Sequence, residues 1–189
     1  MSHFTSRRFV TPFIGILMLV IFMSAHARPN VSKATDEALF KAAFIYNFAK
    51  FTSWPESVLA EDSALVLCTI GKLEAGFDLK RLSGKIIKNR TVEIKSLNKN
   101  QSAKHCHMLY IAKSEKKRLK KTIDKLKGQS ILTVSDLPNF VKNGGIIQFN
   151  RKKGKTKLII NLDHARDANL EISSRLLILA DVTGKQAKP

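Results

Sequence analysis

Cys68 and Cys106 are the two cysteines of the chain, and each lies in or beside a stretch that predicts a buried strand. Two thiols in a small secreted domain usually form a disulfide. Closing a loop of about 39 residues adds roughly 3 to 4 kcal/mol in the chain-entropy description. The alternative is two separate buried thiols that pack as small apolar side chains. We predict the bridge, and we expect no redox catalysis because the sequence has no Cys-x-x-Cys motif.

Two histidines flank the second cysteine. His105 and His107 would share one face of a strand, and His-x-His is a reasonable start for a zinc or copper site. No third ligand is visible nearby, and a cysteine in a disulfide cannot bind a metal. We therefore favour an ordinary strand end over a metal site.

Asp163 and Asp167 are the remaining pair with a spacing that suits chemistry. Four residues apart at a predicted helix start, they could act as paired carboxylates in acid and base catalysis. Carboxylates at this position more often complement the helix dipole. The sequence contains no Gly-x-Ser-x-Gly, His-Glu-x-x-His, P-loop or Gly-x-Gly-x-x-Gly motif. We therefore predict no catalytic residue and no cofactor.

The first 27 residues form a predicted signal peptide. Arg7 and Arg8 supply a positive start, residues 9–23 are uncharged and mostly apolar, and a small-residue cleavage site ends at Ala27. The alternative is an uncleaved anchor, but a run of about fifteen residues broken by Pro12 is shorter than the ~20 residues that a bilayer needs. Cleavage leaves 162 residues, which we place in the periplasm.

The chain is strongly basic, with 33 Lys and Arg against 15 Asp and Glu, and the mature part keeps a net charge of +16. Outside the cytoplasm, nucleic acid is a poor candidate partner, whereas anionic lipid headgroups, cell-wall polymers and acidic protein faces are better ones. The basic stretches 113–127 and 151–155 form a candidate docking surface for the anionic envelope. The alternative is an ordinary solvated face.

A helical period begins at Thr35 and stops near Ser53, because Pro55 disfavours a helix before it. Residues 28–35 are predicted to be a flexible arm, and residues 184–189 a tail. The expected buried face of the helix holds Leu39, Phe40, Ala43, Phe44, Phe48 and Phe51, and the expected polar side holds Lys41, Asn47 and Lys50.

Apolar runs at 64–70 and 107–112 predict buried strands, residues 91–94 predict an alternating strand, and residues 131–134 predict a fourth strand. Short helices are expected at 77–82 and 138–141, and a basic helix is expected from Ser114, as its cap, to Gly128. Segments 146–149 and 157–162 predict a hairpin, and residues 163–180 are expected to be mostly helical, with Ser173 or Ser174 as a cap. The fold class is a single α/β domain over residues 36–183, with a mixed, mostly parallel sheet, helices on both faces and a C-terminal β-hairpin that forms an antiparallel edge.

Several motifs resemble those of the YfiR-like family of periplasmic proteins. The longest is LFKAAFIYNFAKFTSWP at residues 39–55, followed by a strand that ends in CTIG at 68–71. Towards the C-terminus, GGII at 144–147, INL at 160–162 and LEISSRLL at 170–177 are similar to the closing motifs of that family. The resemblance spans residues 36–183.

The resemblance implies a non-enzymatic regulator that binds the periplasmic part of an inner-membrane diguanylate cyclase and represses it, which lowers cyclic di-GMP and biofilm formation. It also implies a homodimer and sequestration by an outer-membrane lipoprotein. Cys68 and Cys106 match one bridge of the family. A second bridge lies near Gly144-Gly145 in the family, and this sequence has no cysteine there. Redox control therefore does not carry over with the resemblance.

The predicted partner residues are Tyr46, Asn47 and Lys50 on the polar side of the first helix, and Arg175, which interrupts an apolar stretch. Filling of a helix face or a local ion pair is the alternative role for each of them. Two other functions stay open beside the regulator. One is a small-molecule or anionic-ligand binding module that uses the C-terminal edge of the sheet, and the other is an enzyme without a recognisable motif.

Overall fold

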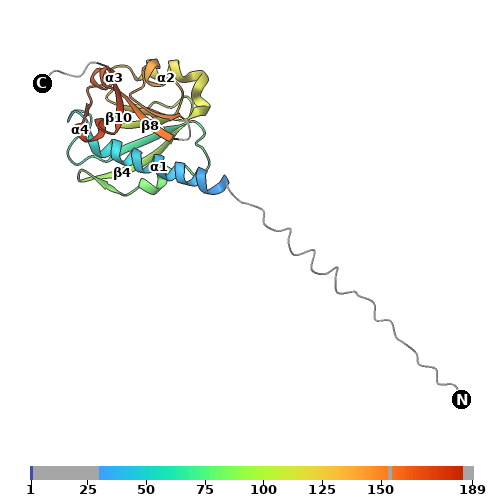
Figure 1. Cartoon of the computed structure of the whole chain (residues 1–189). Helices are drawn as coiled ribbons and strands as arrows, with labels where there is room; N and C mark the ends of the chain where they lie inside the picture. Colours follow the sequence, from blue (N-terminus) through green and yellow to red (C-terminus); the bar gives the residue numbers. More distant parts are fainter. Residues whose placement is uncertain (2–29, 153–154, 185–189) are drawn as a thin grey trace.

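Strand β2 (Leu65–Ile70) is buried along its whole length and lies inside an eight-stranded sheet. The computed structural model describes Met1 and residues 30–152 and 155–184, and its strand order is β10-β8-β7-β6-β5-β2-β4-β3 (Figure 1). The β7–β8 and β3–β4 pairs are antiparallel, and the other neighbours run parallel. This confirms the predicted mixed, mostly parallel sheet.

The other strands of this sheet are β3 (Ile86–Ile87), β4 (Arg90–Leu97), β5 (Met108–Ile111), β6 (Leu132–Ser135), β7 (Ile147–Lys152), β8 (Lys155–Asn161) and β10 (Ala180–Thr183). A second, two-stranded sheet pairs β1 (Thr52–Ser53) with β9 (Glu171–Ile172). The α-helices are α1 (Asn30–Phe51), α2 (Leu119–Leu126), α3 (Leu162–Asp167) and α4 (Ser174–Leu177), and the 3-10 helices are η1 (Leu79–Leu82), η2 (Lys113–Arg118) and η3 (Val141–Asn143).

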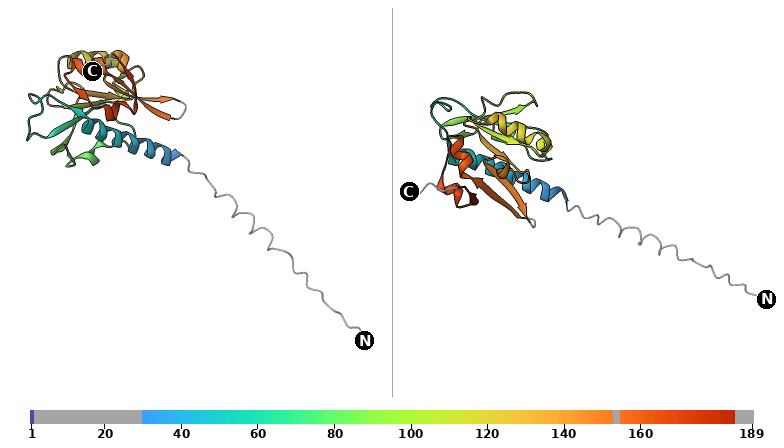
Figure 2. Two further views of the ribbon diagram at one scale, coloured as in Figure 1. Left: turned by 60° about the vertical axis from the view of Figure 1, so that its left-hand side comes forward. Right: turned by 90° about the horizontal axis from the view of Figure 1, so that it is seen from above.

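The sheet separates two apolar cores, because successive strand residues point to opposite faces. Leu65 and Leu67 of β2 face the larger core, which also contains Phe48 of α1. Cys68 faces the smaller core, which also contains Ile123 of α2. Figures 1 and 2 show α1 and α2 on opposite sides of the sheet. The predicted helices on both faces are therefore confirmed.

The first helix differs from the prediction in its start and in its buried face. It begins at Asn30, so residues 30–35 are helical where an arm was predicted. Lys41, assigned to the polar side, is only 1% exposed, whereas Leu39 and Phe40 are 47% and 38% exposed. Figure 2 shows the beginning of α1 reaching past the sheet. There Phe40 stacks on Phe44, with ring centroids 4.4 Å apart, instead of packing on a strand.

The basic helix is shorter than expected and is capped differently. Residues 113–118 form the 3-10 helix η2, and the α-helix begins only at Leu119. Ser114 does not cap it, because the Ser114 hydroxyl accepts a hydrogen bond from the backbone N–H of Lys72. The expected end is confirmed: Gly128 follows the helix with a left-handed φ of 74°.

The C-terminal part was predicted to be mostly helical, and that prediction is only partly right. The hairpin of β7 and β8 is confirmed, as is Ser173 as a helix cap, since its hydroxyl accepts from Arg175 N–H. However, β10 pairs parallel to β8 and forms the sheet edge, so the hairpin is not the edge that the sequence predicted. This strand was missed because it is short, only partly buried and paired with a distant segment.

The predicted signal peptide at 1–27 and the predicted tail at 184–189 lie outside the described residues, except for Met1 and Gly184. Within residues 30–152 and 155–184, no helix is long and apolar enough to cross a membrane.

Candidate functional site

The chain changes direction within the sheet at strand β2. It passes from β2 to β4 on one side and then returns to β5 on the other side of β2. In parallel α/β sheets, such a switch point leaves a crevice at the carboxyl ends of the strands, where ligands commonly bind. Gly71 ends β2 at this place with a φ of 90°, and a Cβ there would lie 2.5 Å from Ser114 Oγ. The loops after β2 and β5 are therefore closely packed at this edge.

Lys41 of α1 reaches this edge, and its ammonium group lies among three carboxylates. Lys41 Nζ is 2.6 Å from Glu74 Oε2, 2.8 Å from Asp136 Oδ2 and 3.4 Å from Glu37 Oε1. Lys113 Nζ lies 2.6 Å from Glu74 Oε1 and 3.2 Å from Asp136 Oδ2. These five residues form what we call the carboxyl-edge cluster. It ties α1 to the segments that follow β2, β5 and β6.

Two cavities adjoin the carboxyl-edge cluster. Their volumes are about 340 Å³ and 330 Å³, and Glu37, Lys113 and Arg151 line both of them. Arg151 of β7 also forms an ion pair with Glu37, which joins the hairpin to α1. Three basic side chains thus face three acidic ones here, and the edge has no excess charge for an anion. The charges are those of Lys41, Lys113 and Arg151 against Glu37, Glu74 and Asp136.

The electrostatics of the cluster keep its lysines charged. Burial acts to lower the pKa of Lys41, but hydrogen bonds and charges from Asp136 and Glu74 outweigh it and raise that pKa above its usual value. The pKa of Lys113 is raised in the same way, against burial, by Glu74 and Asp136. The pKa of Tyr110 is raised by burial and by the charge of Asp136. A lysine nucleophile or base needs a lowered pKa, so the cluster favours binding and packing over catalysis.

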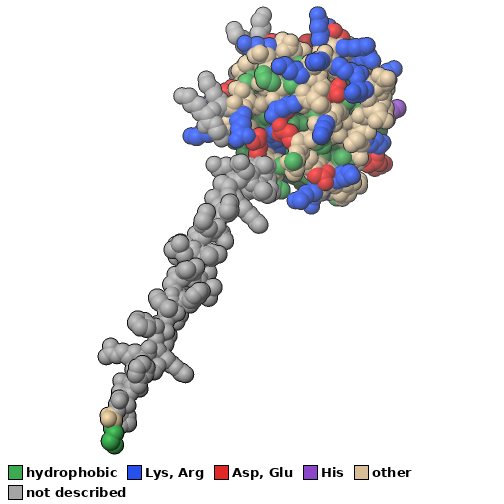
Figure 3. All heavy atoms as spheres, turned by 90° about the vertical axis from the view of Figure 1, so that its right-hand side faces the viewer, with side chains coloured by type: hydrophobic (Ala, Val, Ile, Leu, Met, Phe, Trp, Pro, Cys, Tyr) green, Lys and Arg blue, Asp and Glu red, His purple; other side chains and the backbone are tan. Residues whose placement is uncertain are grey.

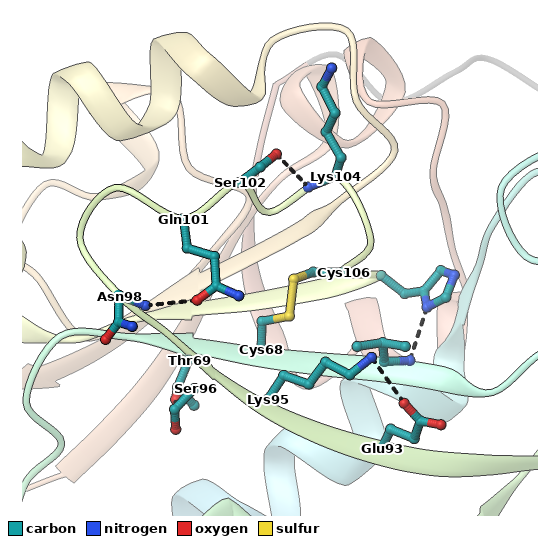
Figure 4. Close-up of a disulfide and its surroundings, with 12 residues drawn as sticks. Cys68, Thr69, Glu93, Lys95, Ser96, Asn98, Gln101, Ser102, Lys104 and Cys106 are labelled. Atoms are coloured by element: carbon teal, nitrogen blue, oxygen red, sulfur yellow. Dashed lines mark hydrogen bonds and ion pairs between the residues drawn. A yellow bond between two sulfur atoms is a disulfide. The ribbon is translucent and has the colours of Figure 1, made fainter.

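Cys68 and Cys106 form a disulfide, which confirms the predicted bridge. Their Cα atoms are 5.8 Å apart. The bridge joins the middle of β2 to Cys106, which lies two residues before β5 (Figure 4). Both cysteines are buried in the smaller core. The bridge therefore holds the end of the 98–106 connection against the sheet.

His107 has a structural role in this arrangement. Its Nδ1 accepts a hydrogen bond from Val66 N–H at 2.9 Å, and Nε2, which then carries the proton, lies 3.1 Å from the carbonyl oxygen of Val58. Both ring nitrogens are thus occupied and Cys106 is in the disulfide, so His-x-His does not form a metal site. Among the described residues, no group of three or more His, Cys, Asp and Glu is placed to hold a metal. Burial lowers the pKa of His107.

The YfiR/HmsC-like family model matches residues 38–181, which are most of the chain. The chain belongs to the YfiR/HmsC-like family. A search of the curated proteins gave no match. Members of the YfiR/HmsC-like family are regulators of diguanylate cyclase activity and are generally non-enzymatic. The match covers α1 from residue 38 onwards, both cores and the disulfide, so the resemblance seen in the sequence motifs is confirmed at the level of the family.

The four predicted partner residues lie on two neighbouring helices of this YfiR/HmsC-like domain. Tyr46 and Asn47 of α1 are half-buried, and Lys50 is exposed, with its Nζ 5.7 Å from the ring centroid of Phe51. Arg175 is exposed on α4, which packs against α1. Their role in partner binding stays a prediction.

Asp163 and Asp167 do not form a catalytic pair in a cleft between elements. Both belong to the single short helix α3, where Asp163 lies in the first turn and forms an ion pair with Arg166. The cap of this helix is Asn161, whose side chain accepts from the N–H groups of Asp163 and His164. The dipole interpretation is confirmed for Asp163, but it is wrong for Asp167, because Asp167 is the last residue of α3 and lies at the opposite end of the helix dipole.

The carboxyl-edge cluster was not predicted from the sequence. One local signal could have indicated it: Lys41 follows Ala38 by three residues and precedes Ile45 by four, so it occupies the same helical stripe as two fully apolar positions. A lysine on such a stripe needs buried acidic partners. Asp136 follows β6 directly, but it is 95 residues away in the chain, and the local pattern does not reveal the pairing.

Proposed function

We propose that this protein binds the periplasmic part of an inner-membrane diguanylate cyclase and represses the enzyme. The observation that carries the proposal is the match to the YfiR/HmsC-like family over residues 38–181. A regulator of this kind would bind one conformation of the partner better than the other and so shift its equilibrium. The charged state of the carboxyl-edge lysines supports a non-enzymatic role.

We place the partner surface on α4 and the turn that follows it. Ile178 is 82% exposed and Leu179 is 58% exposed, next to the predicted partner residue Arg175. Adjacent large apolar side chains that are open to solvent commonly mark a protein interface. The neighbouring end of α1 adds Lys50, so the surface combines an apolar centre with basic side chains, which suits a partner with an acidic rim.

The genetic experiment measures cyclic di-GMP in a deletion strain. Deletion should raise cyclic di-GMP, and the wild-type gene supplied in trans should lower it again. The rise should disappear when the target cyclase is deleted as well. Unchanged cyclic di-GMP in the deletion strain under several growth conditions would contradict repression.

The surface is tested by the double variant Ile178→Asp and Leu179→Asp, which should fail to lower cyclic di-GMP in the deletion strain. Ile86→Asp is the matched control, since Ile86 is 58% exposed on β3 at the opposite edge of the sheet. The control should complement like the wild type. Equal complementation by both variants would exclude this surface.

The family resemblance also leads us to propose a homodimer in the periplasm, made from a chain that starts at Arg28, and sequestration by an outer-membrane lipoprotein. Mass spectrometry of the periplasmic protein tests the start of the chain. Size-exclusion chromatography with light scattering tests the dimer. If the double variant is monomeric and the wild type is dimeric, the α4 surface serves the dimer and not the cyclase.

A further inference from the structure

A further concave surface, apart from the two cavities at the carboxyl edge, lies between the loop that joins β4 to Cys106 and the helix α2. Its volume is about 270 Å³, and we call it the basic cleft. It is lined by Lys99, Lys104, Arg118, Lys121 and Lys125, by the polar residues Asn100, Gln101, Ser102, Thr122 and Gln129, and by the apolar residues Ile70, Leu97, Ala103, Leu109 and Leu126. No acidic residue belongs to this lining. We propose that the basic cleft binds a ligand that carries phosphate groups.

The segment that supplies most of the cleft lining is strongly basic. Residues 98–129 contain ten Lys and Arg but two acidic residues, a net charge of +8. One of the acids, Glu115, is buried with its carboxylate 3.9 Å from Arg118 Nε. The other, Asp124, forms an ion pair with Lys127. Neither acid neutralises the lysines of the cleft, and Figure 3 shows a face on which Lys and Arg side chains outnumber Asp and Glu.

Four cations of the cleft are without an acidic partner within the described part of the chain. These are Lys99, Lys104, Lys121 and Lys125, which appear in none of the ion pairs formed there. Lysines and arginines that converge on one hollow repel one another, and an anion relieves that repulsion. The carboxyl edge is the opposite case, because the two lysines of the carboxyl-edge cluster and the neighbouring Arg151 are matched by three acidic groups.

The shape and the other lining groups favour phosphate chemistry. The lysines present charged N–H donors, the groups that bind phosphate oxygens most strongly. Gln101 uses its side-chain oxygen to accept from Asn98 N–H, so its amide nitrogen can still donate to a ligand (Figure 4). Ile70, Leu97 and Leu109 lie among the apolar lining residues. A phosphorylated molecule with an apolar part would therefore use both halves of the cleft.

The rim of the cleft is held in place before any ligand binds. Arg118 donates to the carbonyl oxygen of Lys99 at 2.7 Å, which ties the loop to η2. The other end of the loop is tied to β2 by the disulfide between Cys68 and Cys106, as Figure 4 shows. A fixed rim reduces the loss of conformational entropy on binding. The bridge thus acquires a second role, that of positioning the lysines of the loop.

The test uses the purified mature protein, residues 28–189, at physiological ionic strength. One arm titrates inorganic pyrophosphate by calorimetry. The other measures co-sedimentation with vesicles of phosphatidylglycerol and phosphatidylcholine. The cleft variant is Lys121→Glu with Lys125→Glu, and the matched control is Lys80→Glu with Lys85→Glu. Both double variants replace two lysines by glutamates and therefore change the net charge equally. All four lysines are exposed, so both variants should unfold at the wild-type temperature.

We expect the cleft variant to bind about tenfold more weakly or worse, since two charged contacts to phosphate are reversed, and the control to bind like the wild type. Cleft-dependent binding of pyrophosphate indicates a free phosphorylated molecule, and cleft-dependent binding of vesicles alone indicates a lipid headgroup. Two results would overturn the proposal: no wild-type binding to either probe, or an equal loss in both double variants. Because the assay uses the isolated protein, its failure would leave cyclase repression untouched.

Discussion

The buried ammonium group of Lys41 provides the sharpest test of how this fold is held together. Lys41→Met keeps an unbranched apolar side chain that is one atom shorter, and it removes the charge. The carboxylate of Asp136, whose side chain is 6% exposed, would then lose a partner at 2.8 Å. Glu74 would lose one at 2.6 Å. Because the carboxylate of Asp136 is desolvated, the loss should be far larger than for an exposed ion pair, and most of it should come from Asp136, since the side chain of Glu74 is 42% exposed.

The expected magnitude follows from which partners stay behind. Breaking a buried ion pair by removing one partner typically destabilises a protein by about 3 to 5 kcal/mol. Lys113 stays within 3.2 Å of Asp136 and 2.6 Å of Glu74, so the remaining carboxylates keep one cation. We therefore expect the lower end, about 3 kcal/mol. For a domain of this size, that corresponds to a decrease in Tm of roughly 6 to 12 °C.

Urea unfolding followed by circular dichroism measures the free energy of unfolding of the wild type and of Lys41→Met. Lys50→Met is the control, because Lys50 is exposed on the same helix and its change should stay within about 0.5 kcal/mol. The double variant Lys41→Met with Asp136→Asn should recover part of the loss, since it also removes the uncompensated carboxylate. A decrease below about 1 kcal/mol for Lys41→Met, or no recovery in the double variant, would refute the reasoning.

Two further predictions concern the disulfide and His107. Replacing both Cys68 and Cys106 by Ser should lower the free energy of unfolding by about 3 to 4 kcal/mol in the chain-entropy description, less any strain in the bridge. Denaturation of the wild type with and without reductant should reproduce that difference, and equal midpoints would contradict it. The pKa of His107 is lowered by burial from an ordinary value of 6.5, so the folded state favours the neutral ring. Stability from this group is complete above pH 6.5 and decreases as the pH falls below it, because the unfolded chain then binds the proton more readily. His107→Gln should make the decrease in Tm between pH 7 and 5 smaller. An unchanged slope of Tm against pH would show that other groups cause the decrease.

The sequence predicts the central strands well because their signal is local. Residues 65–70 and 108–111 are short continuous apolar runs, and such runs are typical of strands that are buried on both faces of a sheet. The disulfide was also predictable, since it needed two cysteines beside such strands and an oxidising compartment. The hairpin of β7 and β8 follows for the same reason, from two β-rich segments separated by a loop with a glycine.

The candidate site was less predictable because its partners come from distant parts of the chain. The period of α1 is compatible with two buried faces: one is rich in Phe, and the other contains Ala38, Lys41 and Ile45. The helix buries the face that contains Lys41, and this is possible because Glu74 and Asp136, which are 33 and 95 residues away in the chain, neutralise the Lys41 ammonium group. Strand β10 is a similar case, since its pairing with β8 gives it a structure that its own four residues do not indicate.

Three surfaces of this protein, the carboxyl edge, the basic cleft and α4, differ in charge and polarity. At the carboxyl edge, basic and acidic groups cancel and hold α1 in place. Five basic residues and no acid line the basic cleft, and four of the five lack an acidic partner among the described residues, so their charge is free to attract an anion. On α4, the exposed surface is apolar at Ile178 and Leu179. Binding at the cleft should therefore weaken steeply with added salt, whereas binding through α4 should depend on salt only weakly. A regulator built in this way can respond to an anionic ligand on one surface while it holds a protein partner on another.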